Sequence, residues 1–293
     1  MDKTTQGYTQ LIGRFVKWAQ TQQDIRAAII VGSRARIHNQ PADEWSDLDI
    51  ALFVTDPKLY VSLSGWIEEI GNPWLTFVEP TAAGQSLERR VLFEDGLDVD
   101  FALLPVDLIH QMAGTEVPAD VAGILQRGMK VLLDKDGLLE RLQVPTHEPQ
   151  LPKPPTQAEF LELVSDFWYH AVWTAKKLRR GELWTAKGCS DNYMKWRLLR
   201  MVEWHAHTTN GWNYDTWHGG RFLEQWASPR VVEGLQDAFA YYDEDDLWRG
   251  LFATMDLFRW LAIETAKRLD FSYATSADEH TTEFVQSLFS EKG

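Results

Sequence analysis

The chain has 293 residues and a formal net charge of −14. The length suits two domains of ordinary size, and the charge argues against a nucleic-acid duplex as partner, because phosphate binding needs a basic surface. A negative field would attract a small polycation, although many cytoplasmic proteins are acidic for solubility alone. No apolar run reaches the roughly 18 residues of a membrane span and no signal-peptide core is evident, so we expect a cytoplasmic protein with no membrane partner. The single cysteine, Cys189, excludes an intramolecular disulfide and a cysteine-based zinc cluster.

The first half of the chain carries apolar, β-rich runs, at residues 27–33, 47–54, 74–78, 88–94 and 97–104. Asp95 and Gly96 separate the last two runs, and both residue types tolerate the positive φ of a tight hairpin turn. We therefore predict that the last two runs are neighbouring antiparallel strands.

Prolines mark a boundary between the two halves. Residues 145–156 contain five of the twelve prolines, and proline both removes an amide donor and disfavours helix in the residue before it. We predict a first domain at residues 1–148, a Pro-rich linker at 149–156 and a helical domain at 157–293.

Helical periodicity dominates the second half. Thr156 and Glu159 form a capping-box pattern, and apolar residues then recur every three or four positions, as one buried helix face requires: Phe160, Val164, Phe167, Ala171, Ala175 and Leu178. Further helical patterns follow at 198–206 and 247–261. Ten of the fourteen tryptophans lie in this half, and we interpret its aromatic residues as the core of a helical bundle and not as a ligand platform.

Paired carboxylates open the run 47–54. Side chains two residues apart share one face of a strand, so Asp47 and Asp49 would point the same way, at a cost unless a cation lies between them. Carboxylate oxygens favour Mg²⁺ or Mn²⁺. Asp98 and Asp100 share a face of the later hairpin, and a third carboxylate could complete a two-metal site for displacement at phosphorus. The alternative is a strand end with exposed acids.

A glycine-serine turn precedes these carboxylates. Gly32 permits close backbone approach, and Ser33 adds a hydroxyl at the start of a helix or a nest of amides that would favour phosphate oxygens. Arg34 and Arg36 are nearby cations that could bind a triphosphate, although a solvated loop explains each of them equally well.

These motifs resemble a known family. Gly32-Ser33, Asp47-Leu48-Asp49 and Asp100 resemble the signature of the polymerase-β-type nucleotidyltransferases. More closely, GSRAR, DEWSDLDIALFVTD, VDFALLP and KVLLDKDG resemble the aminoglycoside 6-adenylyltransferases, which act on streptomycin. FWYHAVWTAKKLRRGELWTAK and DNYMKWRLLRMVEWH resemble that family's helical region, so the likeness covers about residues 25 to 215.

The resemblance implies an α+β protein with a mixed β-sheet flanked by helices in its N-terminal nucleotidyltransferase domain, and an all-α bundle in its C-terminal domain. ATP and the acceptor would bind between the two. Asp47 and Asp49 match the family's paired metal ligands, Asp100 its third carboxylate and candidate base, and Gly32-Ser33 its phosphate-binding loop. We choose Asp100 over Asp98 because it lies deeper in its strand.

The expected reaction is transfer of AMP from ATP to a hydroxyl of an aminoglycoside, streptomycin foremost, with two Mg²⁺ ions and release of pyrophosphate. Lys187 and Lys195 are candidates to reach the triphosphate, with surface lysines as the alternative. Glu79 and Glu203 are candidates to bind the acceptor's positive charges. The acidic cluster at 241–246 is better explained as a polar helix start.

Other interpretations stay open to different degrees. The same site would serve an acceptor that is a protein or a nucleic-acid end, as in toxin–antitoxin nucleotidyltransferases, and the sequence sets no oligomeric state. Retention of all three acids argues against a non-catalytic binding protein. Arg200 and His205 have the spacing of some helical nucleases, but five residues of ideal helix place their side chains about 140° apart, which is poor geometry for one site.

Overall fold

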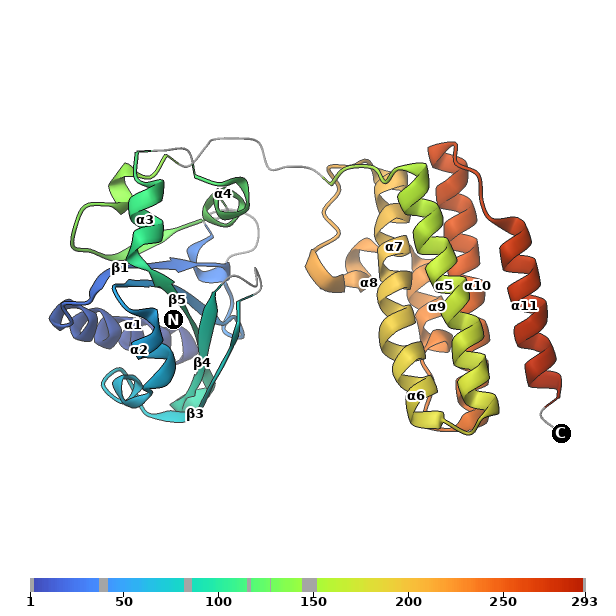
Figure 1. Cartoon of the computed structure of the whole chain (residues 1–293), viewed down its shortest axis with the longest axis horizontal. Helices are drawn as coiled ribbons and strands as arrows, with labels where there is room; N and C mark the ends of the chain where they lie inside the picture. The colour runs from blue at the N-terminus through green and yellow to red at the C-terminus, as the bar shows by residue number, and fades with distance from the viewer. Residues whose placement is uncertain are drawn as a thin grey trace. The chain divides into compact units, whose positions relative to one another are not determined.

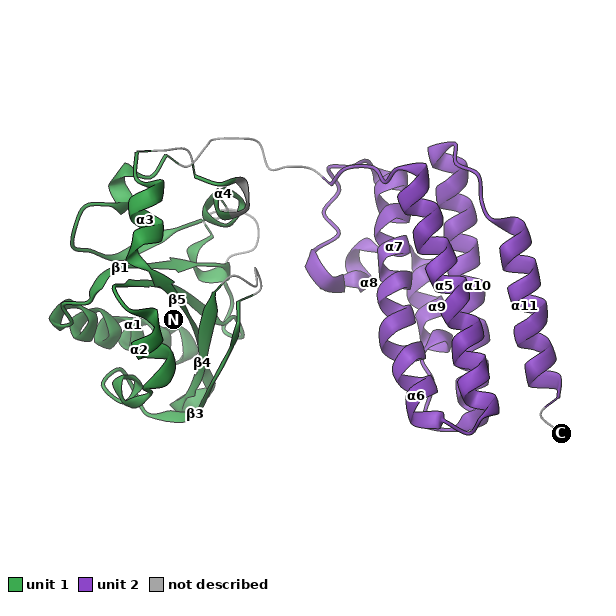
Figure 2. Cartoon of the chain, in the orientation of Figure 1, with its two compact units in different colours: residues 1–150 green, residues 151–293 purple. Residues whose placement is uncertain are grey.

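The structure is a computed structural model, and it describes residues 3–36, 42–81, 86–114, 117–126, 128–143 and 152–291. The chain divides into two compact units, residues 1–150 and 151–293 (Figure 2). Of the predicted linker 149–156, residues 149–151 lie outside the described residues and 152–156 precede the first helix of the second unit without regular structure. Within the described residues, each helix is too short or too polar to cross a membrane.

The first unit is built on a six-stranded sheet with the order β3-β4-β5-β2-β1-β6 (Figure 1). Its central pair, β2 and β5, is parallel, whereas the other neighbours are antiparallel, which confirms the prediction of a mixed sheet. The strands are β1 Ile25–Val31, β2 Leu48–Val54, β3 Pro73–Pro80, β4 Leu87–Phe93, β5 Leu97–Pro105 and β6 Lys130–Asp134.

The predicted hairpin joins β4 to β5. Asp95 and Gly96 have φ values of 64° and 72°, in the left-handed region that their residue types tolerate. The register that follows pairs Phe93 with Leu97 and, further from the turn, Arg90 with Asp100. The turn therefore decides which side chains of β4 lie beside the carboxylates of β5.

Helices cover the two faces of this sheet unequally. One face packs against α1 (Lys3–Thr21) and α2 (Pro57–Ser62), and α1 buries Tyr8, Leu11, Phe15 and Ala19 at helical spacing. On the other face, α3 (Val106–Met112) and α4 (Ala119–Gln126) pack over the β1 and β2 positions, in a cluster with Ala27, Ile29, Ala51 and Phe53. Among the described residues of this unit, the same face stays open over β3 and β4, where Phe77 is 48% exposed.

The second unit is a helical bundle, as predicted (Figure 1). Thr156 caps its first helix, because its Oγ1 accepts the Glu159 backbone N–H at 3.2 Å while Glu159 Oε2 accepts the Thr156 N–H at 2.7 Å. A π-helical turn at Cys189–Met194 joins two of the helices. The helices are α5 Gln157–Arg179, α6 Leu183–Gly188, α7 Lys195–Asn210, α8 Leu223–Trp226, α9 Pro229–Ala238, α10 Glu244–Leu269 and α11 Thr275–Ser290.

Aromatic side chains fill the core of the bundle, but not all of them are buried. The rings of Phe167 and Phe258 stack with centroids 3.6 Å apart, and Trp168 and Trp248 are fully buried. Trp184, in contrast, is 80% exposed. The interpretation of the aromatic residues as core is therefore right for the buried ones and wrong for the exposed ones, among them Trp184 and Trp196.

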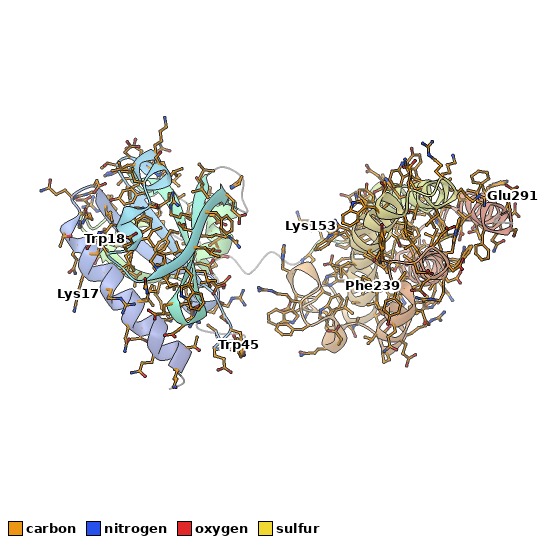
Figure 3. All side chains as sticks on the ribbon, turned by 90° about the horizontal axis from the view of Figure 1, so that it is seen from below. Lys17, Trp18, Trp45, Lys153, Phe239 and Glu291 are labelled. Carbon is orange, nitrogen blue, oxygen red and sulfur yellow. The ribbon has the colours of Figure 1, made fainter. Side chains whose placement is uncertain are left out.

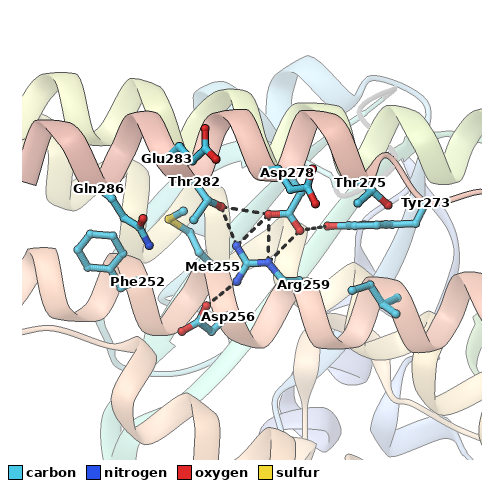
Figure 4. Close-up of a pocket in the computed structure, with 12 residues that line it drawn as sticks. Phe252, Met255, Asp256, Arg259, Tyr273, Thr275, Asp278, Thr282, Glu283 and Gln286 are labelled. Atoms are coloured by element: carbon cyan, nitrogen blue, oxygen red, sulfur yellow. Dashed lines mark hydrogen bonds and ion pairs between the residues drawn. The ribbon is translucent and has the colours of Figure 1, made fainter.

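An ion-pair network ties α11 to α10. Arg259 Nε donates to Asp278 Oδ2 at 2.8 Å, and the Tyr273 hydroxyl donates to the same oxygen at 2.8 Å (Figure 4). These groups line a groove between the two helices, with Phe252 and Met255 as apolar neighbours. Because Asp278 is buried, the network fixes how the last helix packs on the bundle.

Candidate active site

Three aspartates converge on the open face of the sheet. Asp49 in β2 and Asp100 in β5 lie directly opposite each other in the parallel register, and Asp47 immediately precedes β2. Each carboxylate offers an oxygen, and these oxygens all lie within 4.8 Å of one another. The face geometry that the sequence predicted for the three side chains is therefore present.

The carboxylates of this cluster repel one another. Burial, together with the charges of Asp47 and Asp100, raises the pKa of Asp49 to about 7. Burial also raises the pKa of Asp100 to about 6, partly opposed by the Arg90 guanidinium. A divalent cation would relieve this repulsion, and a set of carboxylate oxygens suits Mg²⁺ or Mn²⁺, so the donor set fits such an ion.

Gly32 brings the preceding turn against this cluster. Its φ of 68° and ψ of −150° belong to a region that only glycine adopts readily, and a Cβ atom there would lie 2.0 Å from Asp49 Oδ2. Ser33 follows in a single 3₁₀ turn, Ser33–Ala35. Its Oγ is buried and has no hydrogen-bond partner among the described residues, so the hydroxyl is a polar group available to a ligand.

Arg34 is used inside the protein. Its Nε donates to the carbonyl oxygens of Ser46 at 3.1 Å and of Asp47 at 3.0 Å, and its guanidinium lies 3.6 Å from the centre of the Tyr8 ring. The side chain therefore holds the loop that delivers Asp47. Its predicted role in nucleotide binding remains a prediction, as does that of Arg36, which is half-buried and precedes residues outside the described ranges.

Asp98 has a different environment from Asp100. The hydroxyl of Tyr8, in the N-terminal part of α1, donates to Asp98 Oδ1 at 2.9 Å. Asp98 does not belong to the carboxylate cluster. The choice of Asp100 over Asp98 agrees with this placement.

The loop before β2 also presents an exposed tryptophan. Asp43 Oδ1 accepts hydrogen bonds from the Trp45 backbone N–H at 3.0 Å and from Ser46 Oγ at 2.8 Å. Trp45 itself is 84% exposed and projects from the unit (Figure 3). Sequence reasoning did not single out Trp45, and its position two residues before Asp47 was the available signal.

A second group that sequence reasoning missed lies on β4. Arg90 Nη2 is 3.1 Å from Asp100 Oδ2, and Arg90 Nε is 2.6 Å from Glu79 Oε1 and 3.2 Å from Glu88 Oε1. Counting back from a two-residue Asp95-Gly96 turn would have placed Val91 opposite Asp100, but the turn spans Glu94–Gly96, and this shift of one residue brings Arg90 there. Glu79, a predicted contact for the acceptor, thus lies in the first unit in one network with the third carboxylate.

The lysines predicted for the triphosphate are engaged within the second unit. Lys187 pairs with Asp191, and Lys195 Nζ donates to Thr254 Oγ1 at 2.9 Å. Burial lowers the pKa of Lys195 to about 8. The surface-lysine alternative is wrong for Lys195, which is buried. Whether either lysine contacts a nucleotide stays a prediction.

The remaining predicted residues of the second unit have local partners. Glu203 pairs with Arg200 at 3.1 Å, and burial raises the pKa of its carboxyl. His205 is buried against Trp260, and the centroids of the two rings are 5.0 Å apart. This placement does not pair it with Arg200. Asp243 Oδ1 accepts the Asp246 N–H at 2.9 Å and caps α10, which confirms that the acidic cluster at 241–246 starts a helix.

Carboxylates held on neighbouring strands beside a glycine-serine turn suit in-line displacement at phosphorus, and together with the mixed sheet they define a nucleotidyltransferase. Comparison with known families narrows this class. The chain belongs to the streptomycin adenylyltransferase family, whose model matches residues 5–288. It is therefore an adenylyltransferase enzyme.

Two individual relatives agree with the family. An aminoglycoside 6-adenylyltransferase of Bacillus subtilis is 26% identical over 96% of this chain and 97% of its own length. One from Campylobacter jejuni is 27% identical over 92% of this chain and 91% of its own. A crystal structure described as an aminoglycoside 6-adenyltransferase from Bacillus subtilis aligns at 23% identity, with a TM-score of 0.46, over 95% of this chain and 97% of that one.

Proposed function

We propose that this enzyme transfers AMP from ATP to a hydroxyl group of an aminoglycoside, with streptomycin as the favoured acceptor, and releases pyrophosphate. The convergence of Asp47, Asp49 and Asp100 carries the proposal, because a divalent cation would relieve the repulsion among three carboxylates so close together. Membership of the streptomycin adenylyltransferase family supports the choice of nucleotide and acceptor.

The metal chemistry belongs to the aspartate cluster. Asp47, Asp49 and Asp100 would hold Mg²⁺, as two ions, which would neutralise charge at the phosphates and lower the pKa of the acceptor hydroxyl. Asp100, the third carboxylate of the cluster, is the candidate to take the proton of the acceptor hydroxyl.

The glycine-serine turn binds the phosphates. Gly32 lets the backbone lie against Asp49 without a side chain between them, so amide groups can approach the same region as the metal ligands. The Ser33 hydroxyl, which has no hydrogen-bond partner in the described part of the chain, can donate to a phosphate oxygen. Positioning of ATP against the acceptor then supplies much of the rate enhancement.

Acidic side chains next to the cluster suit a cationic acceptor. Glu79 and Glu88 face each other across β3 and β4, on the same open face as Asp100. Phe77 adds exposed apolar surface beside them. We propose that Glu79 binds a positive group of the acceptor, and the same role for Glu203 stays a prediction.

The test is mass spectrometry of streptomycin after incubation with the enzyme, ATP and Mg²⁺. We expect a product heavier by one AMP residue, abolished in Asp49→Asn and retained in Asp98→Asn, whose side chain can still accept the Tyr8 hydrogen bond. Product formed at the wild-type rate by Asp49→Asn would contradict the metal assignment. Label from ATP appearing only in protein or nucleic acid of a cell lysate would favour the macromolecular acceptor.

A further inference from the structure

Arg90 stands in one row with the metal-binding carboxylates. The register places Arg90 of β4 opposite Asp100 of β5, and Asp100 opposite Asp49 of β2, so the three side chains are successive neighbours across the sheet. The Arg90 side chain is 44% exposed, whereas the Asp100 side chain is only 13% exposed. A cation thus lies at the open side of the half-buried carboxylate.

The same guanidinium reaches three acids on three strands. Its Nη2 lies 3.1 Å from Asp100 Oδ2, and its Nε lies between Glu79 Oε1 at 2.6 Å and Glu88 Oε1 at 3.2 Å. An isolated surface ion pair contributes little, but a planar fork held from two sides has a fixed orientation. The contacts of Arg90 with Glu79 and Glu88 therefore determine where Nη2 meets Asp100.

Arg89, the neighbouring residue, shows that this role is specific to one face of the strand. Its side chain is buried on the opposite face, where Nε donates to the Tyr60 carbonyl at 3.1 Å and Nη1 donates to Thr76 Oγ1 at 3.2 Å. Because side chains alternate along a strand, Arg89 packs against α2, whereas Arg90 contacts the acidic residues Glu79, Glu88 and Asp100.

We propose that Arg90 is a positioning residue that orients the Asp100 carboxylate for metal binding and anchors it to the acidic pair Glu79 and Glu88. This rests on the proposed function. A carboxylate has two oxygens, so the oxygen that Arg90 does not hold can face a cation. Partners that orient a ligating carboxylate commonly change metal affinity or activity by about 10-fold to 100-fold when they are removed.

The charge of Arg90 and its geometry can be separated by substitution with lysine. Arg90→Lys keeps a positive charge next to Asp100 but loses the fork that contacts three acids together. A purely electrostatic counter-ion would survive this change, whereas a positioning residue would not. Arg26→Lys is the matched control, because Arg26 Nε donates to Asp136 at 2.8 Å with a side chain that is 30% exposed, in the same unit.

The experiment titrates Mn²⁺ into the nucleotide-free full-length protein and follows the signal of free Mn²⁺ by electron paramagnetic resonance. We expect Arg90→Lys to weaken Mn²⁺ binding by about tenfold or more and to lower kcat by about 10-fold to 100-fold, while Arg26→Lys leaves both unchanged. Wild-type Mn²⁺ affinity in Arg90→Lys would overturn the proposal.

A double-variant cycle shows whether Arg90 acts through Asp100. If it does, Arg90→Lys causes no further loss of Mn²⁺ affinity once Asp100→Asn is present, and a second full loss in that background would refute this route. The proposed function has its own readout. Mn²⁺ binding that Asp49→Asn leaves intact would remove the metal site and the role of Arg90 together, whereas loss in Asp49→Asn with normal binding in Arg90→Lys would remove only the role of Arg90.

Discussion

Gly32 and Asp49 are in such close contact that a single methyl group on Gly32 would lie 2.0 Å from Asp49 Oδ2. We expect Gly32→Ala to displace the metal ligand and lower activity by about 100-fold or more, since misplacing a reacting group by about 1 Å can cost that much. Gly96→Ala is the matched control, because Gly96 also has a positive φ, of 72°, but an added Cβ there would have no atom of the described residues within 4 Å.

Both glycine variants lose stability from backbone strain, of about 1 kcal/mol or somewhat more. Only Gly32→Ala should lose turnover, measured as kcat with saturating ATP and streptomycin. Equal activity losses in the two variants would mean that strain, and not contact with Asp49, explains the glycine.

The cluster of Asp47, Asp49 and Asp100 predicts that the stability of the folded chain depends on pH when no metal is bound. The pKa of Asp49 rises from 3.8 to about 7 in the folded chain, so the folded state holds this proton more tightly than the unfolded state. Its stabilising contribution is complete below about pH 3.8 and is lost as the pH rises through about 7.

We therefore expect the Tm measured in EDTA to fall more steeply from about pH 5 to about pH 8 in the wild type than in Asp49→Asn, which has no charge to bury. Mg²⁺ at about pH 8 should raise the Tm of the wild type by mass action and leave Asp49→Asn nearly unchanged. Parallel curves of Tm against pH for the two proteins would show that Asp49 does not have this raised pKa.

Strand periodicity was enough to predict much of this site. The two-residue spacing of Asp47 and Asp49 sets their common face, and the Asp95-Gly96 turn sets the antiparallel partner of β5. Spacing could not predict the parallel register of β2 and β5. These strands are neighbours in the sheet, but along the chain about forty residues and two other strands lie between them. Asp100 was matched to the cluster by resemblance, and only the register explains why it lies opposite Asp49.

Partners of the charged side chains were beyond sequence reasoning. Arg34 and Lys195 looked like candidates for the phosphates because their type and position fit, yet Arg34 holds backbone carbonyls and Lys195 is buried against Thr254. A positively charged residue in a motif can bind the ligand, or it can hold the loop that forms the ligand's site. Its tertiary contacts decide which of the two it does. Arg90 was missed for the converse reason, since its partners come from three strands.

Arg34 offers a test of that distinction. Arg34→Lys loses the fork on the carbonyls of Ser46 and Asp47 and the planar contact with Tyr8, so we expect a loss of stability of about 1–2 kcal/mol in urea unfolding. The loop that carries Asp47 would be less well held, and kcat should fall while the KM for ATP changes little. A large rise in the KM for ATP with unchanged kcat would instead assign Arg34 to the nucleotide.

In the second unit, Arg259 has two acidic partners that differ in burial. Asp278 is 5% exposed and accepts from Arg259 and Tyr273, whereas Asp256 is 75% exposed at its side chain. Removing the buried partner leaves a partly buried guanidinium uncompensated, so we expect Asp278→Ala to cost about 3 kcal/mol in urea unfolding followed by helical circular dichroism. Asp256→Ala removes an exposed pair and should cost less than about 1 kcal/mol. Neither change should alter Mn²⁺ binding, because the metal ligands lie in the first unit. Equal losses from the two variants would show that burial of Asp278 does not determine the strength of the contact between α10 and α11.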